Sequence, residues 1–287
     1  MQKIKIATDS TADIPVNFCE KLNISVLPLT IRANDKDYRD GIDISTHEFY
    51  KILEESQTLP VSSQVSVNLY SELYENTYKE GYTDLIQVTL NSKGSGTYQA
   101  AVLSKNIFFE ENADAKDKFN IHIIDSKTYS MAYGIPVIEG AQMIKSGASV
   151  EEIIAHINDW LEHTRAMFVP LVLRFVKKSG RISPAAAFVG DALGLKPLIT
   201  FEDGDAKIVS KARGEKNAIK MLLDRCLSER RPGTNYALVY GNNTETFNEL
   251  KSACSKTLDC PPIAEYHVGC VIGINTGPNM IGILYRT

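Results

Sequence analysis

Small hydroxyl and amide side chains follow several strand-like segments of this sequence. The clearest case is the stretch 89–98, where Asn91 and Ser92 come after an apolar run and Gly94 and Gly96 precede a helical pattern. Free backbone N–H groups at a helix start favour an anion, and glycine lets a ligand approach them closely. The stretch matches neither a P-loop nor a complete dinucleotide fingerprint. It predicts an anion-binding loop or, alternatively, a capped helix after a tight turn.

Two more polar stretches are candidates for contact with a ligand. The segment 60–66 holds Ser62, Ser63 and Ser66, of which Ser66 is a candidate helix cap and the first two remain for a ligand. Asp9 follows the first strand-like run, and we expect it either to accept N–H groups from neighbouring loops or to form an Asx-turn. Ligands of open α/β sheets gather outside the carboxyl ends of strands, and Asp9 is expected at such an end.

The second half of the chain adds three candidate stretches. Residues 267–278 hold spaced glycines with two polar candidates, His267 and Asn275. Arg174 and the loop 177–181, which ends at Arg181, form a basic spot in an acidic protein, so either solvated charge or an anionic ligand or partner explains them. The small-residue stretch 184–195 leaves room for close packing or for a narrow slot.

Composition excludes several classes of function. The 287 residues carry a net charge of -4, which argues against a nucleic-acid binder. Five cysteines without C-x-x-C spacing favour reduced thiols in the cytoplasm over a disulfide framework or a zinc site. We expect no signal peptide, transmembrane segment, metal or cofactor, since no sequence pattern predicts one.

Alternating short β-rich runs and longer helical runs predict an α/β fold. In the first half, strands are expected at 4–8, 24–31, 85–90 and 121–124, with helices near 15–22, 46–56, 68–80, 96–111 and 130–146. Ser45 with Glu48 and Ser149 with Glu152 have capping-box spacing. Strands separated by helices imply a mainly parallel sheet.

The second half predicts a mixed sheet. Strands are expected at 167–173, 197–201, 207–212, 237–240, 263–268 and 281–285, with helices near 184–192, 214–230 and 245–257. Asp203-Gly204 between two strands predicts an antiparallel hairpin. We therefore predict two α/β domains, residues 1–165 and 166–287, the first with a mainly parallel sheet and the second with a mixed one.

Taken together, these stretches resemble the DegV family, the fatty-acid-binding subunits of bacterial fatty acid kinases. The resemblance covers nearly the whole chain in order, and it rests on residues 7–13, 62–64, 91–99, 125–127, 180–183, 194–197 and 267–278. It implies two α/β domains holding one long-chain fatty acid, and a separate ATP-dependent kinase that phosphorylates the carboxylate to an acyl phosphate for phospholipid metabolism. It also implies that this chain is a carrier and not itself an enzyme.

The resemblance assigns residue roles. Ser62 falls on the hydroxyl that holds the carboxylate, and Asn91 and Ser92 fall on a pair of strand-end serines beside Gly94. Arg174, Arg181 and His267 fall where contacts to the headgroup or the kinase are expected. The family usually has Ser at the place of Asn91 and His at the place of Asn275. The second departure bears on kinase competence more than on lipid binding.

A lipid ligand is physically reasonable for such a site. A tail of about fifteen carbons gains on the order of 12 kcal/mol gross, at roughly 0.8 kcal/mol per buried methylene. The carboxylate needs donors when it is buried, and Ser62, Asn91 and Ser92 are candidates. On this basis we expect Ser92→Ala to weaken lipid binding by about 1.5–3 kcal/mol.

Three other functions are also compatible with the sequence. The first is an acyl hydrolase with Ser92 and His267 as nucleophile and base, although the chain has no G-x-S-x-G elbow. The second is a carrier of a small polar molecule, because the fold is similar to the substrate domain of dihydroxyacetone kinases, where a histidine holds the substrate covalently. The third is a regulatory or scaffold protein.

Overall fold

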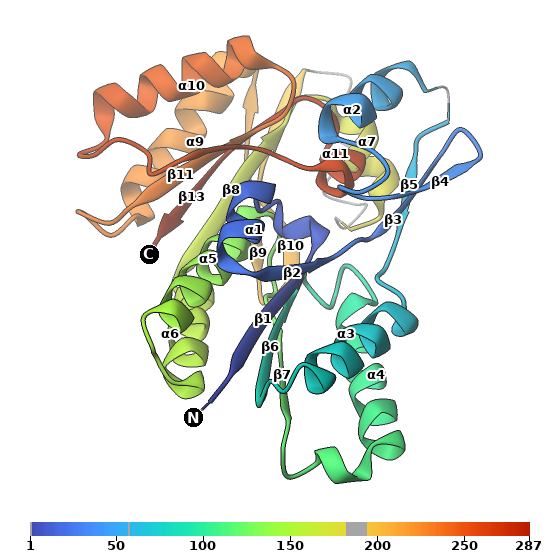
Figure 1. Cartoon of the computed structure of the whole chain (residues 1–287). Coiled ribbons are helices and arrows are strands. Elements are labelled where there is room, and N and C mark those ends of the chain that lie inside the picture. Colours follow the sequence, from blue (N-terminus) through green and yellow to red (C-terminus); the bar gives the residue numbers. More distant parts are fainter. Residues whose placement is uncertain (1, 57, 182–193) are drawn as a thin grey trace.

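A computed structural model describes residues 2–56, 58–181 and 194–287 of the chain. Its strands, drawn as arrows in Figure 1, are β1 (Ile4–Asp9), β2 (Ile24–Leu27), β3 (Thr30–Ala33), β4 (Lys36–Arg39), β5 (Val61–Ser63), β6 (Asp84–Thr89), β7 (Asn120–Asp125), β8 (Thr164–Pro170), β9 (Leu195–Glu202), β10 (Asp205–Arg213), β11 (Tyr236–Tyr240), β12 (Glu265–His267) and β13 (Met280–Arg286). Its helices are α1 (Val16–Leu22), α2 (Thr46–Glu55), α3 (Val67–Lys79), α4 (Thr97–Glu111), α5 (Met131–Lys145), α6 (Val150–Glu162), α7 (Leu173–Ser179), α9 (Glu215–Glu229), α10 (Thr244–Thr257) and α11 (Cys270–Thr276).

The predicted fold class is confirmed. The sheet of the first half has the order β2-β1-β6-β7, and all of its neighbouring strands are parallel. The sheet of the second half has the order β10-β9-β8-β13-β11-β12 and is mixed, because only β11 and β12 pair in parallel. A small antiparallel sheet, β4-β3-β5, accompanies them. The proposed domain boundary near residue 165 stays a prediction.

Local sequence signals place the helix starts. Ser45 and Ser149 each accept a hydrogen bond from the backbone three residues on, and Glu48 and Glu152 return the bond to the cap, so both capping boxes form as predicted. The Ser66 side chain accepts a hydrogen bond from Leu69 N and so caps the start of α3. Asp203-Gly204 turns β9 into β10 as expected.

The structure corrects some predicted elements. The expected strand 24–31 is split into β2 and β3, because Pro28 interrupts the backbone donors and the two pieces join different sheets. The expected strand 167–173 begins and ends three residues earlier, and α7 follows it. The patterns of β4, β5, α7 and α11 were too short to predict. The expected helix near 184–192 and most of the small-residue stretch lie outside the described residues.

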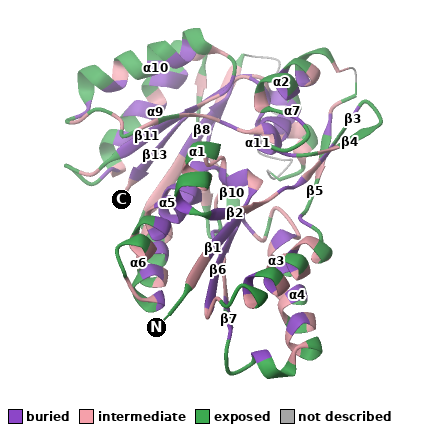
Figure 2. Ribbon diagram, viewed as in Figure 1, coloured by how far each residue is buried: buried purple, intermediate pink, exposed green. Residues whose placement is uncertain are grey.

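Two apolar clusters make up the core, shown in purple in Figure 2. One lies between the six-stranded sheet and helices α9 and α10, where Leu198, Leu222 and Ile283 are buried. The larger one contains the parallel sheet with its helices and continues onto the other face of the six-stranded sheet, where Phe168, Ile199 and Val239 belong to it. The contact between the two halves of the chain is therefore part of the core.

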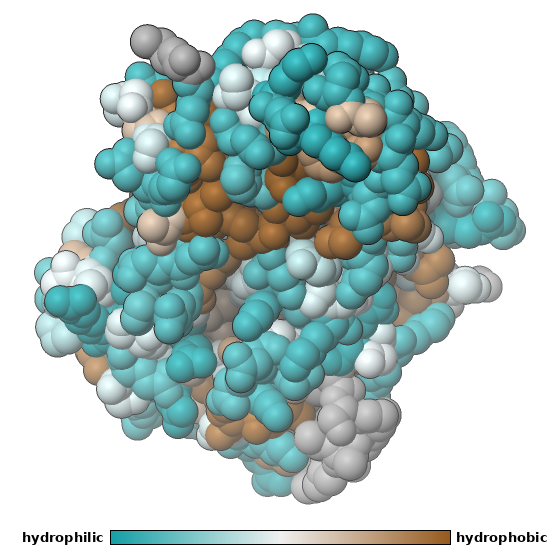
Figure 3. All heavy atoms as spheres, turned by 90° about the horizontal axis from the view of Figure 1, so that it is seen from below, coloured by the Kyte–Doolittle hydropathy of each residue, from teal (hydrophilic) through white to brown (hydrophobic). Residues whose placement is uncertain are grey.

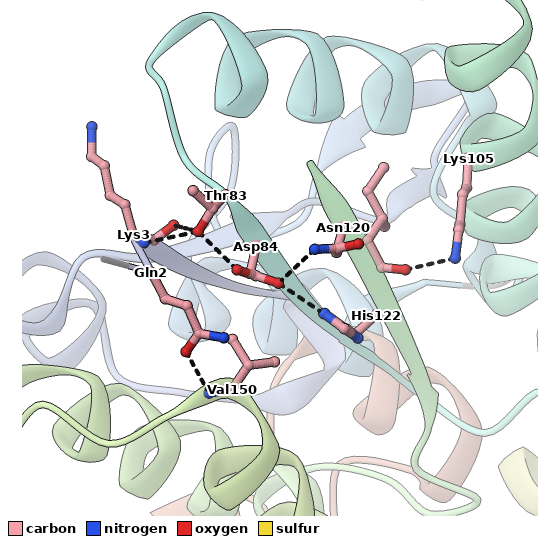
Figure 4. Close-up of polar contacts among 9 residues, drawn as sticks. Gln2, Lys3, Thr83, Asp84, Lys105, Asn120, His122 and Val150 are labelled. Carbon is pink, nitrogen blue, oxygen red and sulfur yellow. Dashed lines mark hydrogen bonds and ion pairs between the residues drawn. The ribbon is translucent and has the colours of Figure 1, made fainter. Parts of the chain in front are cut away.

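A polar cluster holds the starting ends of β6 and β7 (Figure 4). The buried Asp84 carboxylate accepts hydrogen bonds from the Thr83 hydroxyl at 2.8 Å and from the Asn120 amide at 3.2 Å, and it lies 3.2 Å from the His122 ring. These contacts join neighbouring strands at the edge opposite to their carboxyl ends. Functional groups are expected at the other edge.

Candidate functional site

A cavity of about 430 Å³ lies between the two halves of the chain. Its lining comprises Leu29, Ser62, Ser63, Gln64, Leu90, Gly94, Ser95, Gly96, Tyr129, Ser130, Ala166, Met167, Phe168, Ser179, Arg181, Phe201, Ala206, Val239, Val268, Val271, Ile272, Asn275, Thr276, Met280 and Leu284. This volume is in the range of small-molecule sites, and most such sites have largely apolar walls. Arg181 is the single charged residue of this lining among the described residues.

Alternation along the strands of the six-stranded sheet builds the apolar wall. In β8, Phe168 faces the larger cluster and the cavity, whereas the next residue, Val169, packs toward α9 and α10. In β13, Leu284 lines the cavity and its neighbours Ile283 and Tyr285 pack on the opposite face. A strand with apolar residues on both faces packs against two apolar clusters, one on each side of the sheet.

Aromatic rings form one part of this wall. The ring of Tyr129, which follows β7, lies 4.7 Å from the ring of Phe201 in β9. Phe201 stacks on Phe168 of β8 at 5.9 Å. All three residues line the cavity, and their rings come from both halves of the chain. We call Tyr129, Phe201 and Phe168 the aromatic wall.

Polar groups gather around the loop that precedes α4. Arg181 donates from Nε to the Gly94 carbonyl at 3.4 Å and from a terminal nitrogen to Ser179 O at 2.6 Å. A side chain on Gly94 would overlap the Tyr129 hydroxyl, and one on Gly96 would overlap the Gln64 amide. Gln64, Tyr129 and Arg181 therefore all approach the same short piece of backbone, beside the free N–H groups of a helix start.

Four of the sequence-predicted site residues lie in the cavity lining: Ser62, Gly94, Asn275 and Arg181. No hydrogen bond to another described residue uses the Ser62 or Gln64 side chain, so both are available to a ligand. Asn275 uses its amide nitrogen on Val271 O at 2.8 Å, and its buried Oδ1 has no partner among the described residues.

The structure does not bring Asn91 to the lining. Its buried amide donates to Gly204 O at 2.6 Å and to the Tyr129 hydroxyl at 3.0 Å, and its Oδ1 accepts from Lys93 N at 3.1 Å. Both amide hydrogens are used, so none remains for a carboxylate. In this geometry Asn91 contacts the cavity wall instead of facing the cavity.

Ser92 also lies outside the lining. Its hydroxyl donates to Asp125 Oδ2 at 2.5 Å, and its backbone N–H donates to Asp125 Oδ1 at 3.0 Å. The hydroxyl hydrogen that a carboxylate would need is already used by another carboxylate. The physical reason given above for a large effect of Ser92→Ala on lipid affinity is absent from this geometry.

His267 and Arg174 are the other two sequence-predicted site residues that do not line the cavity. The two ring nitrogens of His267 lie 3.0 Å from Val268 O and 3.2 Å from Asn242 Oδ1, and burial lowers the pKa of the imidazole. Arg174 is exposed and lies over the ring of Phe175. Ser92 and His267 thus have separate partners, and the structure does not form the nucleophile–base pair of the hydrolase reading. His267 does not line the cavity either, so the structure does not place it to hold a small substrate covalently.

The carboxyl groups of the buried Asp9 and the half-buried Asp13 lie behind the polar end. Asp9 accepts from Leu90 N at 2.8 Å, as expected for a residue that orders a neighbouring loop, and from Thr11 N at 3.1 Å, which is the bond of the alternative Asx-turn, so the structure contains both. Asp13 accepts from the hydroxyl of Ser130, a lining residue, and from the backbone N–H before α11. Burial raises the pKa of both carboxyl groups, that of Asp13 to about 8.

The prediction missed Gln64, Ser95, Tyr129 and Ser130 as lining residues. A signal for two of them was present, since Tyr129 and Ser130 follow β7, a strand that the sequence predicts, whereas Gln64 follows β5, whose pattern was too short to predict. The apolar lining residues gave no separate signal, because their patterns are those of ordinary core strands.

The surface and the remaining side chains add three observations. The face seen from below carries a band of hydrophobic residues between hydrophilic flanks (Figure 3). In the described ranges, no group of three or more His, Cys, Asp or Glu side chains is arranged to hold a metal ion. No helix of the described parts is long and apolar enough to cross a membrane.

Comparisons with known sequences cover the whole chain. The profile of the DegV family, described as a family of uncharacterised proteins, matches residues 3–287. A DegV domain-containing protein of Caldanaerobacter subterraneus is 34% identical over 100% of this chain and 99% of its own length. One of Clostridium acetobutylicum is 32% identical, with 99% of each chain covered.

Solved structures of the same shape bind fatty acids. A fatty-acid-binding DegV family protein of Thermus thermophilus has a TM-score of 0.86 and 27% identity, with 100% of both chains covered. DegV of Bacillus subtilis, described as a fatty acid binding protein, has a TM-score of 0.83 and 28% identity over 99% of each chain. A stearic acid-binding protein of Eubacterium ventriosum has a TM-score of 0.87 and 25% identity over 100% of this chain and 98% of its own.

Proposed function

This chain belongs to the DegV family, and from that premise we propose that it binds one long-chain fatty acid in the cavity between its two halves. One observation carries the proposal: a largely apolar cavity of about 430 Å³ has a single charged side chain among its described lining residues, Arg181. An apolar chain with one anionic end is complementary to that distribution of charge. The fatty-acid-binding relatives of the same shape support it.

The two ends of the ligand have different energetic roles in this proposal. The tail packs on the aromatic wall and on the aliphatic residues of β11, α11 and β13, and gains roughly 0.8 kcal/mol per buried methylene. The carboxylate lies near the Gly94–Gly96 loop, where Arg181, Ser62, Gln64 and the Tyr129 hydroxyl supply donors. These donors offset the cost of removing the carboxylate from water.

The proposal extends to a partner. We propose that the chain is a carrier without catalytic activity of its own, located in the cytoplasm, and that an ATP-dependent fatty acid kinase phosphorylates the carboxylate it presents. The exposure of Arg181 and Arg174 supports this, because both basic side chains lie where a second protein can reach them. The resemblance described above supplies the partner and its place in phospholipid metabolism.

Removing the Arg181 charge is expected to weaken binding of hexadecanoic acid about tenfold in Arg181→Met. The residue is exposed, so this figure lies near the lower end of the range for hydrogen bonds to charged groups. Affinity for hexadecanol, which has no charge, is expected to change less than twofold in the same variant. Lys178→Met removes a nearby exposed charge outside the lining and serves as the control.

Equilibrium titration of both ligands into the three proteins tests the assignment. An equal loss of affinity for the acid and the alcohol would mean that Arg181 acts on the fold and not on the carboxylate. A loss in Lys178→Met as large as in Arg181→Met would mean that general surface charge is responsible.

The kinase step has its own test. With ATP and a fatty acid kinase subunit, the loaded chain is expected to yield acyl phosphate, trapped as a hydroxamate, whereas the chain with ATP alone yields none. Arg174→Glu is expected to slow the kinase reaction at least tenfold through reversed charge at the contact, with unchanged fatty acid affinity. Acyl phosphate formed by the chain alone, or an unchanged rate in Arg174→Glu, would contradict this part of the proposal.

A further inference from the structure

The loop before α4 touches the tip of the β9–β10 hairpin through one buried side chain. Asn91, which is 1% exposed, donates one amide hydrogen to Gly204 O at 2.6 Å and the other to the Tyr129 hydroxyl at 3.0 Å. Its Oδ1 accepts from Lys93 N at 3.1 Å, so the orientation of the amide is fixed by three partners. The contact joins residues 113 positions apart in sequence.

The hairpin tip is shaped to accept this side chain. Gly204 has a φ of +81°, which favours glycine, and a Cβ at this position would lie 2.6 Å from Asn91 Oδ1. Any larger residue at 204 would displace the amide. The turn Asp203-Gly204 therefore both closes the hairpin and lets its backbone approach the loop.

Both acceptors of the Asn91 amide belong to the structure of the cavity wall. Tyr129 is the first ring of the aromatic wall, and its ring lies 4.7 Å from that of Phe201. Phe201 pairs with Ala206 across the hairpin whose tip is Gly204, and both line the cavity. A shift of the hairpin tip relative to the loop would therefore move two sides of the wall together.

We propose that Asn91 is a positioning residue that ties the hairpin to the loop, and that this tie sets how long a bound acyl chain stays and which chain lengths fit best. The inference rests on the proposed function for its ligand. It does not place Asn91 in contact with that ligand, since its donors are already used. A serine at 91, with one hydroxyl hydrogen, would satisfy only one of the two acceptors.

The experiment compares the wild type with Asn91→Ser and Asn91→Ala. Lys93→Met is the matched control, because the Lys93–Asp205 ion pair, at 2.8 Å, crosses the same contact but is half-exposed. Stopped-flow displacement measures the dissociation rate of a fluorescent hexadecanoic acid analogue, and titration gives the affinity ratio for tetradecanoic and octadecanoic acids. Amide hydrogen exchange of residues 199–208 is followed without ligand.

Dissociation is expected to be about fivefold faster in Asn91→Ser, which loses one of the two buried hydrogen bonds, and at least tenfold faster in Asn91→Ala, which loses both. The affinity ratio for the two chain lengths is expected to differ at least threefold from that of the wild type, which a uniform loss of stability would not produce. Lys93→Met is expected to stay within twofold of the wild type, as exposed ion pairs contribute little.

The failure of this inference is distinguishable from that of the proposed function. If the wild type binds no fatty acid, the proposed function fails. Hydrogen exchange still tests whether Asn91 holds the hairpin against the loop. Exchange in the hairpin is expected to be faster in the Asn91 variants than in the wild type. Exchange as slow in the Asn91 variants as in the wild type would overturn the inference. If the wild type binds fatty acid, an equal dissociation rate and an equal chain-length ratio in the variants would also overturn it.

Discussion

Ala206→Trp is expected to lower the affinity for a long-chain fatty acid more than 100-fold. Ala206 lies on β10 in the cavity lining, opposite Phe201. An indole at this position occupies space for about four methylenes, and at roughly 0.8 kcal/mol each their exclusion costs about 3 kcal/mol. Equilibrium titration with hexadecanoic acid measures the effect.

Lys207→Trp provides the control for this substitution. Lys207 is the next residue of the same strand, is exposed, and points to the other face because side chains alternate along a strand. It introduces the same ring without filling the cavity, so the affinity is expected to stay near that of the wild type. If both variants bind as tightly as the wild type, the tail does not occupy the cavity beside Ala206.

The second large effect is on stability and depends on pH through Asp13. Burial raises the pKa of its carboxyl group to about 8, and the nearby carboxyl groups of Asp40 and Asp9 act in the same direction, while donors from Ser130 and Gly269 oppose it. A folded-state pKa above the unfolded value of about 4 means that the native state holds the proton more tightly. The free energy of unfolding is therefore expected to fall as pH rises from about 4 to about 8.

Asp13→Asn isolates this contribution. Because the amide carries no charge at any of these pH values, the variant is expected to be more stable than the wild type at pH 8, on the order of 3–5 kcal/mol, and similar to it near pH 4. Urea unfolding at several pH values between 4 and 8 gives the two curves. Parallel curves for wild type and variant would show that Asp13 ionises in the folded state as it does in the unfolded chain.

Much of the fold follows from local rules, and particular residues show why. Ser45 and Ser149 cap their helices because the capping box involves residues three positions apart. Asp203-Gly204 forms its turn for a similarly local reason. Pro28 was visible in the sequence, yet its effect, a chain that leaves one sheet for another, depends on strand pairing that no local rule supplies.

The site was predictable in place but not in atomic detail. The predicted strand end at Leu90 marked the segment around Gly94, the hydroxyl cluster at 60–66 marked Ser62, and both segments line the cavity. These signals could not show that the donors of Asn91 and Ser92 are already used, since their acceptors, Gly204 and Asp125, are distant in sequence. The surroundings of His267 could not be predicted for the same reason, because its ring contacts Tyr50 and Tyr240, which come from other parts of the chain.

The central claim is that an acyl chain with an acid end occupies this cavity, and solvent extraction of the purified protein followed by mass spectrometry tests it most directly. The account predicts about one equivalent of long-chain fatty acid per chain from the wild type, and a small fraction of that from Ala206→Trp prepared in the same way. An extract of the wild type without fatty acid, together with no uptake when hexadecanoic acid is added, would contradict it.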